Sequence, residues 1–250
     1  MRPPHRCALL LLPLLGVLHV FPAVAQNSPF PLDALSERAR EKIDPVLEDY
    51  TLKRVLELEH RILNRPLHQF LLDRPDVGAA IARGLGIGNY TITRKEKDLF
   101  YGVDPDGIEG NLEILYRDEG HRMYFAQGTA EGAVLTVRGK LLMLHESQYR
   151  TSDQGQLSVQ TQLTVYAKIE NAFLAFLLKL FAPLIGELAD PKLSKAQGVV
   201  RQVSELIVED PQGTYSRIVE SDQVACEDLT ILHKLISRSE PLVAKKGEPC

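Results

Sequence analysis

The sequence predicts an α+β fold, with a curved antiparallel sheet of about six strands gripped by a long C-terminal helix and preceded by N-terminal helices. Three observations support this. The segment LSVQTQLTVYAKI (157–169) alternates apolar and polar residues over its whole length, as a strand with one buried face does. Turn-forming residues divide the region from 89 to 156 into short β-like stretches. The run NAFLAFLLKLFAPLIGELADP (171–191) follows and is long enough for a covering helix.

The first 25 residues have the pattern of a secretory signal peptide. Arg2 and Arg6 precede an apolar block from Ala8 to Val20, and Ala23-Val24-Ala25 forms a small-residue cleavage site. The block is shorter than the roughly 20 residues of a membrane span. We therefore expect cleavage after residue 25 and a secreted or periplasmic protein, with an uncleaved N-terminal anchor as the alternative.

The charge balance bears on the possible partners, and the cysteine content bears on a disulfide bond. Loss of the signal removes two arginines, so that 27 basic residues face 33 acidic ones, a balance that argues against nucleic acid as a partner. Two cysteines then remain, Cys226 and Cys250. In an oxidising compartment we expect them to form a disulfide bond, worth roughly 3 kcal/mol in the chain-entropy picture. Two free thiols are the alternative.

Residues 26–65 are predicted to form an N-terminal helical segment. From Leu32 to Leu63 the chain is rich in charge, and Pro66 ends the pattern because proline disfavours helix at the residue before it. Such a helix would be amphipathic and able to dock a partner protein. The apolar stripe at helical spacing consists of Val46, Leu47, Leu52, Val55, Leu56, Ile62 and Leu63.

The main α+β domain is predicted over residues 66–211. It begins with two short helices over 67–88, interrupted by Pro75, and continues with strands from Asn89 to Ile169 that include a hairpin turn at Asp118-Glu119-Gly120. A second helical stretch follows Pro191. Residues 212–250 are expected to be a C-terminal extension with a strand-like piece, TYSRIV (214–219), and a short helix over 229–236.

No catalytic or metal-binding motif is present. The chain lacks the G-x-S-x-G nucleophile motif, and the Glu57–His60 spacing of two-iron helix bundles has no second copy. His145, Ser147 and Tyr149 are alternate residues of a predicted strand and should share one face of it. We expect no catalytic residues, no metal and no cofactor.

The apolar run at 171–191 is the strongest indication of function. Lys179, Pro183 and Glu187 exclude a membrane span, since charges at bilayer depth are costly, so an integral membrane protein is not expected. The helix is then either part of a core or the wall of a cavity. In the second case the ligand-binding residues are Leu157, Val159, Leu163, Val165, Phe173, Phe176, Leu177, Leu180 and Phe181.

This order of elements resembles the START-like, or helix-grip, superfamily of polyketide cyclases and lipid carriers. The resemblance is carried by the helices at 67–88, the strands over 89–169 and the helix NAFLAFLLKLFAPLIGEL. It implies that the helix grips a curved sheet around an apolar cavity. The expected strand before the two short helices is missing, because 32–63 is predicted as helix.

We therefore expect an exported protein that binds a hydrophobic small molecule or lipid between the sheet and the C-terminal helix. A first alternative is an envelope structural protein that docks a protein partner through its N-terminal helix. A second is a cyclase- or isomerase-like enzyme that uses His145, Tyr149 or Tyr116.

Overall fold

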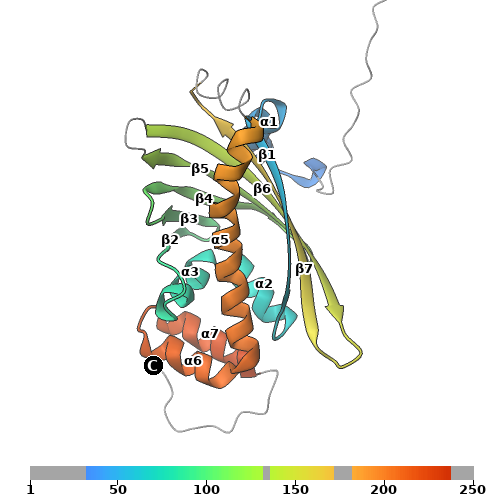
Figure 1. The fold of residues 1–250 in the computed structure, drawn as a ribbon, viewed down its shortest axis with the longest axis vertical. Coiled ribbons are helices and arrows are strands. Elements are labelled where there is room, and N and C mark those ends of the chain that lie inside the picture. The colour runs from blue at the N-terminus through green and yellow to red at the C-terminus, as the bar shows by residue number, and fades with distance from the viewer. Residues whose placement is uncertain (1–31, 132–135, 172–181, 238–250) are drawn as a thin grey trace, which may run out of the picture.

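The computed structural model shows an α+β protein built on one antiparallel sheet (Figure 1). The structure describes residues 32–131, 136–171 and 182–237. Seven strands follow in the order β1-β7-β6-β5-β4-β3-β2, and every neighbouring pair is antiparallel. The predicted signal peptide at 1–25 and Cys250 lie outside the described residues.

Six of the strands confirm the prediction for 89–169, and the hairpin turn at 118–120 joins two of them. These strands are β2 (Thr91–Glu96), β3 (Leu99–Val103), β4 (Ile108–Arg117), β5 (His121–Glu131), β6 (Thr136–Thr151) and β7 (Leu157–Ile169). The helices are η1 (Leu32–Ala34), α1 (Glu37–Glu48), α2 (Arg65–Asp73), α3 (Pro75–Gly84), α5 (Ala182–Glu209), α6 (Pro211–Glu220) and α7 (Cys226–Ser237).

The helical prediction for 32–63 is right for α1 but wrong for the residues after it, which form β1 (Leu52–Arg61). The leucine, glutamate, lysine and arginine residues of this segment favour helix, yet they also alternate, so that Leu56, Leu58 and His60 share one face. Ten residues of β1 pair with β7, and this tertiary pairing overrides local propensity. The strand that the helix-grip resemblance requires before α2 is therefore present.

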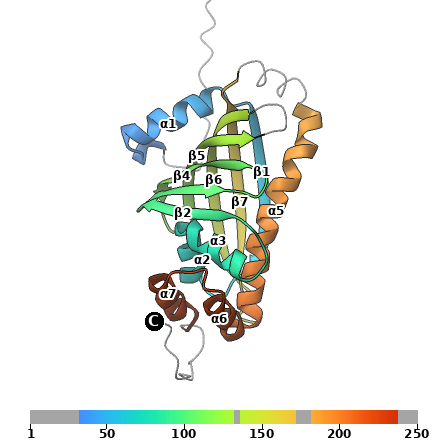
Figure 2. The same cartoon turned by 90° about the vertical axis from the view of Figure 1, so that its left-hand side faces the viewer.

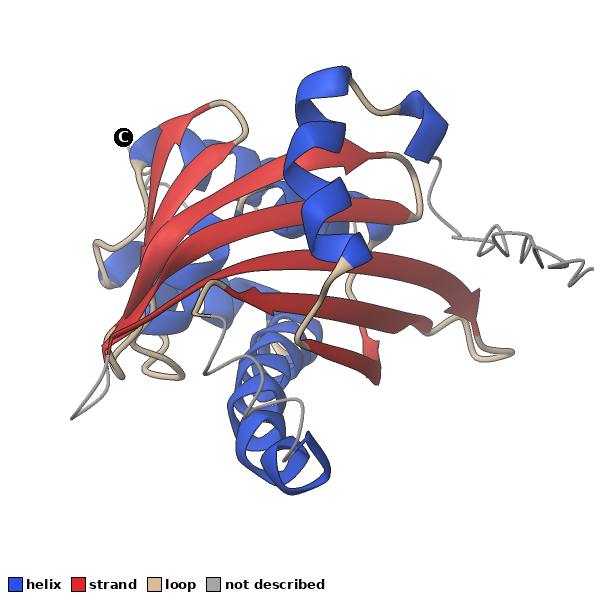
Figure 3. Ribbon diagram, turned by 90° about the horizontal axis from the view of Figure 1, so that it is seen from above, coloured by secondary structure: helices blue, strands red, loops and turns tan. Residues whose placement is uncertain are grey.

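Helix α1 packs on the outer face of the sheet, which we define as the face opposite α2 and α5 (Figure 3). The Ser36 hydroxyl caps the helix by accepting a hydrogen bond from the Ala39 backbone N–H. Its apolar side is buried in one cluster with residues of β5 and β6, so the protein's own sheet occupies the surface that was expected to dock a partner. The buried members are Leu35, Ala39, Ile43, Val46, Met123, Phe125, Leu142 and Leu144.

A second apolar cluster joins α2 and α3 to the three C-terminal helices (Figure 2). Ile81, Ile207, Ile218 and Leu232 are almost completely buried within it. The cluster contains residues from both sides of the predicted domain boundary at 211. The strand-like interpretation of TYSRIV is wrong, because Asp210 caps a helix, α6, that begins with proline at its first position. The helix predicted over 229–236 is confirmed as α7.

Helix α5 runs along edge strand β1, and its C-terminal half joins the helical cluster (Figures 1 and 2). It is continuous through Pro191, where two separate helical stretches were predicted. Ten residues of the predicted apolar run at 171–191, namely 172–181, lie outside the described residues. None of the helices within 32–131, 136–171 and 182–237 has the length and apolarity needed to cross a bilayer.

Candidate functional site: a trough on the inner face of the sheet

The inner face of the sheet, turned toward α2 and α5, forms the candidate site. We call it the trough. Its floor consists of alternate residues of β3 to β7 and β1, because the antiparallel register places directly paired side chains on the same face. Along β6 these residues are Gly139, Leu141, Met143, His145, Ser147 and Tyr149. The predicted shared face of His145, Ser147 and Tyr149 is therefore confirmed.

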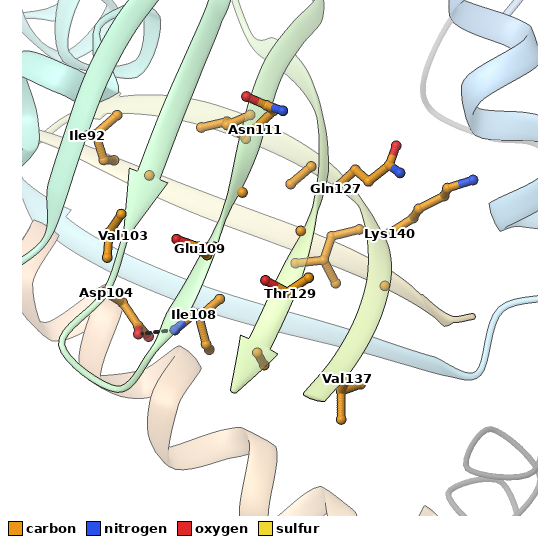
Figure 4. Close-up of a pocket in the computed structure, with 18 of the residues that line it drawn as sticks. Ile92, Val103, Asp104, Ile108, Glu109, Asn111, Gln127, Thr129, Val137 and Lys140 are labelled. Atoms are coloured by element: carbon orange, nitrogen blue, oxygen red, sulfur yellow. Dashed lines mark hydrogen bonds between the residues drawn. The ribbon is translucent and has the colours of Figure 1, made fainter. Parts of the chain in front are cut away.

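One end of the trough holds a pocket of about 440 Å³ (Figure 4). Four glycines cross it in a row, since Gly102 pairs with Gly110, Gly110 with Gly128, and Gly128 with Gly139. All four line the pocket. The backbone itself therefore forms part of the floor, and the pocket occupies space that side chains would otherwise fill.

At two of the four glycines, Gly110 and Gly128, neighbouring strands approach too closely for a side chain. A Cβ atom on Gly110 would lie 2.5 Å from the carbonyl oxygen of Gln127, and one on Gly128 would collide with the carbonyl oxygen of Glu109. Contacts of this kind involve backbone atoms that cannot move aside without breaking the ladder. Only glycine is compatible with this packing at positions 110 and 128, and the bare backbone there contributes to the pocket.

The side chains around the glycines are mainly apolar. Ile108 and Leu141 remain 40% and 38% exposed. The side chains of Asn111, Gln127 and Lys140 belong to the alternate positions, which point to the outer face. The apolar residues that line the pocket, glycines aside, are Tyr90, Ile92, Val103, Ile108, Leu112, Ala126, Ala130, Val137, Leu141 and Ile169.

The predicted ligand-binding residues of β7 lie on the same inner face but further along the trough. Val159 and Val165 are buried, whereas Leu157 and Leu163 are half-buried. Because Val159 pairs with His60 and Tyr149, and Leu163 pairs with His145, these side chains surround a polar cluster rather than the pocket. The other five predicted residues, Phe173, Phe176, Leu177, Leu180 and Phe181, lie outside the described residues.

Helix α2 closes the second end of the trough through three polar contacts with the sheet. The Tyr149 hydroxyl lies 3.1 Å from Nδ1 of His68. The Tyr124 hydroxyl donates to the carbonyl oxygen of Leu72 at 2.9 Å. The Arg122 Nε donates to Oδ1 of Asp73 at 2.6 Å. Each contact places a polar group of the helix against the inner face, so this end of the trough is polar while the pocket end is apolar.

Three histidines from three different elements meet at this closed end. The ring centroid of His68 on α2 lies 5.9 Å from that of His60 on β1 and 6.4 Å from that of His145 on β6. His60 is 5% exposed, and both of its ring nitrogens are buried without a hydrogen-bond partner among the residues that the structure describes. Buried polar atoms in proteins nearly always have a partner, so an orphaned imidazole calls for an explanation.

Burial keeps these imidazoles uncharged. It lowers the pKa of His68 to about 3, and the neighbouring His145 and His60 add to the effect. Burial also lowers the pKa of His145 to about 4, with a further contribution from the positive charge of Arg122. The pKa of His60 is lowered for the same reason. All three are therefore neutral at pH 7 and offer both donors and acceptors.

The sequence does not predict the histidine cluster as a site, and its only metal-like spacing in this region is Glu57-Leu58-Glu59-His60. On a strand, Glu57 and His60 point to opposite faces, so that motif is not formed. Within the described ranges there is no group of three histidine, cysteine, aspartate or glutamate side chains placed to hold a metal ion. Cys226 begins α7, and its disulfide bond with Cys250 stays a prediction.

No family model matches the sequence, and no curated protein matches it. A comparison with solved structures finds a conserved protein from Geobacillus kaustophilus at 12% identity and a TM-score of 0.41, covering 63% of this chain and 96% of that one. Ara h 8.0201 matches at 15% identity and 0.41, over 64% and 100% of the two chains. Truncated norcoclaurine synthase from Thalictrum flavum matches at 14% and 0.35, over 63% and 95%.

Proposed function

We propose that the protein is an exported binding protein that holds a hydrophobic small molecule or lipid in the trough between the sheet and the C-terminal helix. The observation that carries the proposal is the apolar pocket of about 440 Å³ on the inner face. Small-molecule sites in proteins are apolar cavities of this order, about 300–1,000 Å³. The proposal includes a secreted or periplasmic location, because residues 1–25 have the pattern of a secretory signal peptide.

The pocket exposes apolar side chains whose removal from water by a ligand is favourable in free energy. Ile108 and Leu141 together with the bare glycine backbone present an apolar surface to water, and its removal from water is favourable at roughly 25 cal/mol per Å². Met143 and Leu163 continue this surface beyond the pocket. A ligand with an elongated apolar body would therefore be stabilised along the whole trough.

Filling the pocket with a side chain tests the proposal. Ala126 faces the pocket and pairs with Leu112 and Leu141, both of which line it. We expect Ala126→Phe to weaken binding of the neutral fluorescent probe N-phenyl-1-naphthylamine by about tenfold or more, because the ring occupies the volume that the probe needs. Probe fluorescence titrations measure the change.

Gln127→Phe is the matched control. It adds the same ring one residue further along β5, where the side chain is exposed on the outer face. Equal affinities in the two variants, or a wild-type protein that neither carries an apolar molecule in native mass spectrometry nor takes up the probe, would contradict the proposal.

Export is tested separately by the N-terminus of the secreted chain. Cleavage after Ala25 leaves Gln26 as the first residue, and mass spectrometry of the protein recovered outside the cytoplasm identifies it. Recovery of the full-length chain inside the cell alone would contradict export while leaving the binding proposal intact.

A further inference from the structure

We infer that the closed end of the trough binds an uncharged hydrogen-bonding head group, a hydroxyl or carbonyl, of the apolar ligand, through His145, Ser147 and Tyr149. The inference rests on the proposed binding function and adds the chemical class of the ligand. It assigns an amphiphilic molecule with a neutral head, such as a long-chain alcohol, in preference to a fatty-acid anion.

The spacing along β6 supports a single ligand that reaches both ends. Gly139 lies in the pocket, and His145 is six positions further along the same strand, which corresponds to about 20 Å. Leu141 and Met143 lie between them on the same face. A molecule with its apolar body in the pocket and over these two side chains places its other end at the histidine cluster.

The head-group site is formed by half-buried side chains on alternate positions. His145, Ser147 and Tyr149 are all partly accessible on the inner face, and the Ser147 Oγ lies 3.5 Å from Nδ1 of His145. His68 lies behind them and contacts the Tyr149 hydroxyl. Hydroxyl and imidazole groups both donate and accept hydrogen bonds, so together they match a hydroxyl or a carbonyl.

The cluster also has unused hydrogen-bonding capacity. His60 is buried beside His68, and within the described part of the chain neither of its ring nitrogens has a hydrogen-bond partner. A head group bound at His145 and Tyr149 brings a polar group into this cluster, either its own or that of a water molecule that it holds. Such a group supplies hydrogen-bonding capacity next to the unsatisfied ring nitrogens of His60. The unsatisfied His60 ring thus points to a ligand at the closed end, independently of the side chains on β6.

The charges around the site favour a neutral head over an anion. Three arginines flank the cluster, and each already has a carboxylate partner. Arg122 pairs with Asp73 at 2.6 Å, Arg65 with Glu119 at 3.8 Å, and Arg201 with Glu205 at 4.0 Å. The histidines themselves are neutral because burial lowers the pKa of His68 and His145 far below 7. A buried carboxylate would therefore lose its hydration without gaining a positive partner.

The test is competition between two lipids that differ only in the head group. At pH 8, 1-dodecanol and dodecanoate each displace N-phenyl-1-naphthylamine from the wild-type protein. We expect the alcohol to displace the probe at about tenfold lower concentration or less, because it makes the hydrogen bonds without the cost of burying a charge. Equal potency, or a preference for dodecanoate, overturns the inference.

Two variants and a control test whether the preference for the alcohol arises at His145 and Tyr149. Tyr149→Phe and His145→Leu should each bring the alcohol-to-carboxylate ratio several-fold closer to one, with each competition normalised to the variant's own affinity for the probe. Tyr166→Phe removes the same hydroxyl from the outer face of β7 and should leave the ratio unchanged. Circular dichroism confirms that each variant is folded, and if His145→Leu does not fold, the isosteric Tyr149→Phe still decides. An unchanged ratio in Tyr149→Phe overturns the inference.

The two proposals fail differently. If the wild-type protein binds neither the probe nor either lipid, the binding function fails and the head-group assignment fails with it. If the probe binds and Ala126→Phe weakens it while the two lipids compete equally, only the head-group assignment is wrong.

Discussion

Nδ1 of His68 lies 3.1 Å from the Tyr149 hydroxyl, and this contact joins α2 to β6 across the closed end of the trough. His68 is almost completely buried, while Tyr149 is partly accessible and carries the Arg65 guanidinium 4.3 Å from its ring centroid. The tyrosine thus connects a buried imidazole to the surface that a ligand would meet.

Loss of this hydroxyl should destabilise the protein. We expect Tyr149→Phe to lower the free energy of unfolding by about 1–2 kcal/mol, because Nδ1 of His68 is left buried without its partner. Urea denaturation measures the change. Tyr166→Phe, on the outer face, should change stability by less than about 0.5 kcal/mol. Equal effects in the two variants would show that the His68–Tyr149 contact does not stabilise the fold.

The three histidines at the closed end of the trough make stability depend on pH. Their pKa values in the folded protein lie below the ordinary 6.5, at about 3 for His68 and about 4 for His145, so below pH 6.5 the unfolded chain binds more protons than the folded one. Stability is therefore complete above about pH 6.5 and falls as the pH drops toward 4, by up to about 1.4 kcal/mol per pH unit for each histidine.

Urea denaturation at pH 7.5, 6 and 5 measures this dependence. In His145→Gln one of the three groups no longer titrates, and the loss of stability between pH 7.5 and 5 should be smaller than in the wild type. A free energy of unfolding that is the same at pH 7.5 and pH 5 is incompatible with buried neutral histidines.

Gly128 in the pocket and Gly78 in a helix should respond oppositely to alanine. Gly128→Ala forces a Cβ against the Glu109 backbone and should cost about 1–3 kcal/mol. Gly78 lies inside α3, and no atom lies within 4 Å of the position that an added Cβ would take, so Gly78→Ala should stabilise by roughly 0.5–1 kcal/mol. Thermal unfolding compares the two. A neutral Gly128→Ala would show that the strands do not need their close approach.

A partly buried ion pair connects α7 to the start of α3. Both terminal nitrogens of Arg74 donate to the Asp228 carboxylate, at 2.6 and 2.7 Å, and Arg74 also binds Asp76. These carboxylates raise the pKa of the guanidinium above its ordinary value, so the pair stays charged. We expect Asp228→Ala to cost about 2 kcal/mol, since a partly buried cation loses one of two partners. Thermal unfolding measures the loss of stability. Glu227→Ala, at the exposed neighbouring residue, is the control and should lower the stability far less.

The sheet could be predicted from the sequence where alternation was the only regular pattern, as in β7. It could not be predicted for β1, whose residues fit a helix equally well and become a strand only by pairing with residues 157–169, more than 90 positions later. In α6 the apolar and aromatic residues of TYSRIV suggested a strand. The Asp210-Pro211 start signal for a helix was the better indicator.

The candidate site was predictable only in part. The inner face of β7 and the shared side of His145, Ser147 and Tyr149 follow from the period of a strand. The histidine cluster joins β1, α2 and β6, and the glycine row joins four strands, so both depend on pairing that no local pattern specifies. The glycines at 102, 110, 128 and 139 were individually visible, but their alignment was not.

The pairing of β1 with β7 has a consequence for the order in which the chain acquires structure during synthesis. Residues 52–61 can pair only after residues 157–169 have been made. The apolar sides of α2 and α3 stay uncovered until residues 203–236 have been made. A chain emerging from the ribosome therefore cannot complete the sheet edge before residue 169 has been made, or the helical cluster before residue 236. Until then the nascent chain is only partly folded, and the sheet whose inner face forms the candidate site is incomplete.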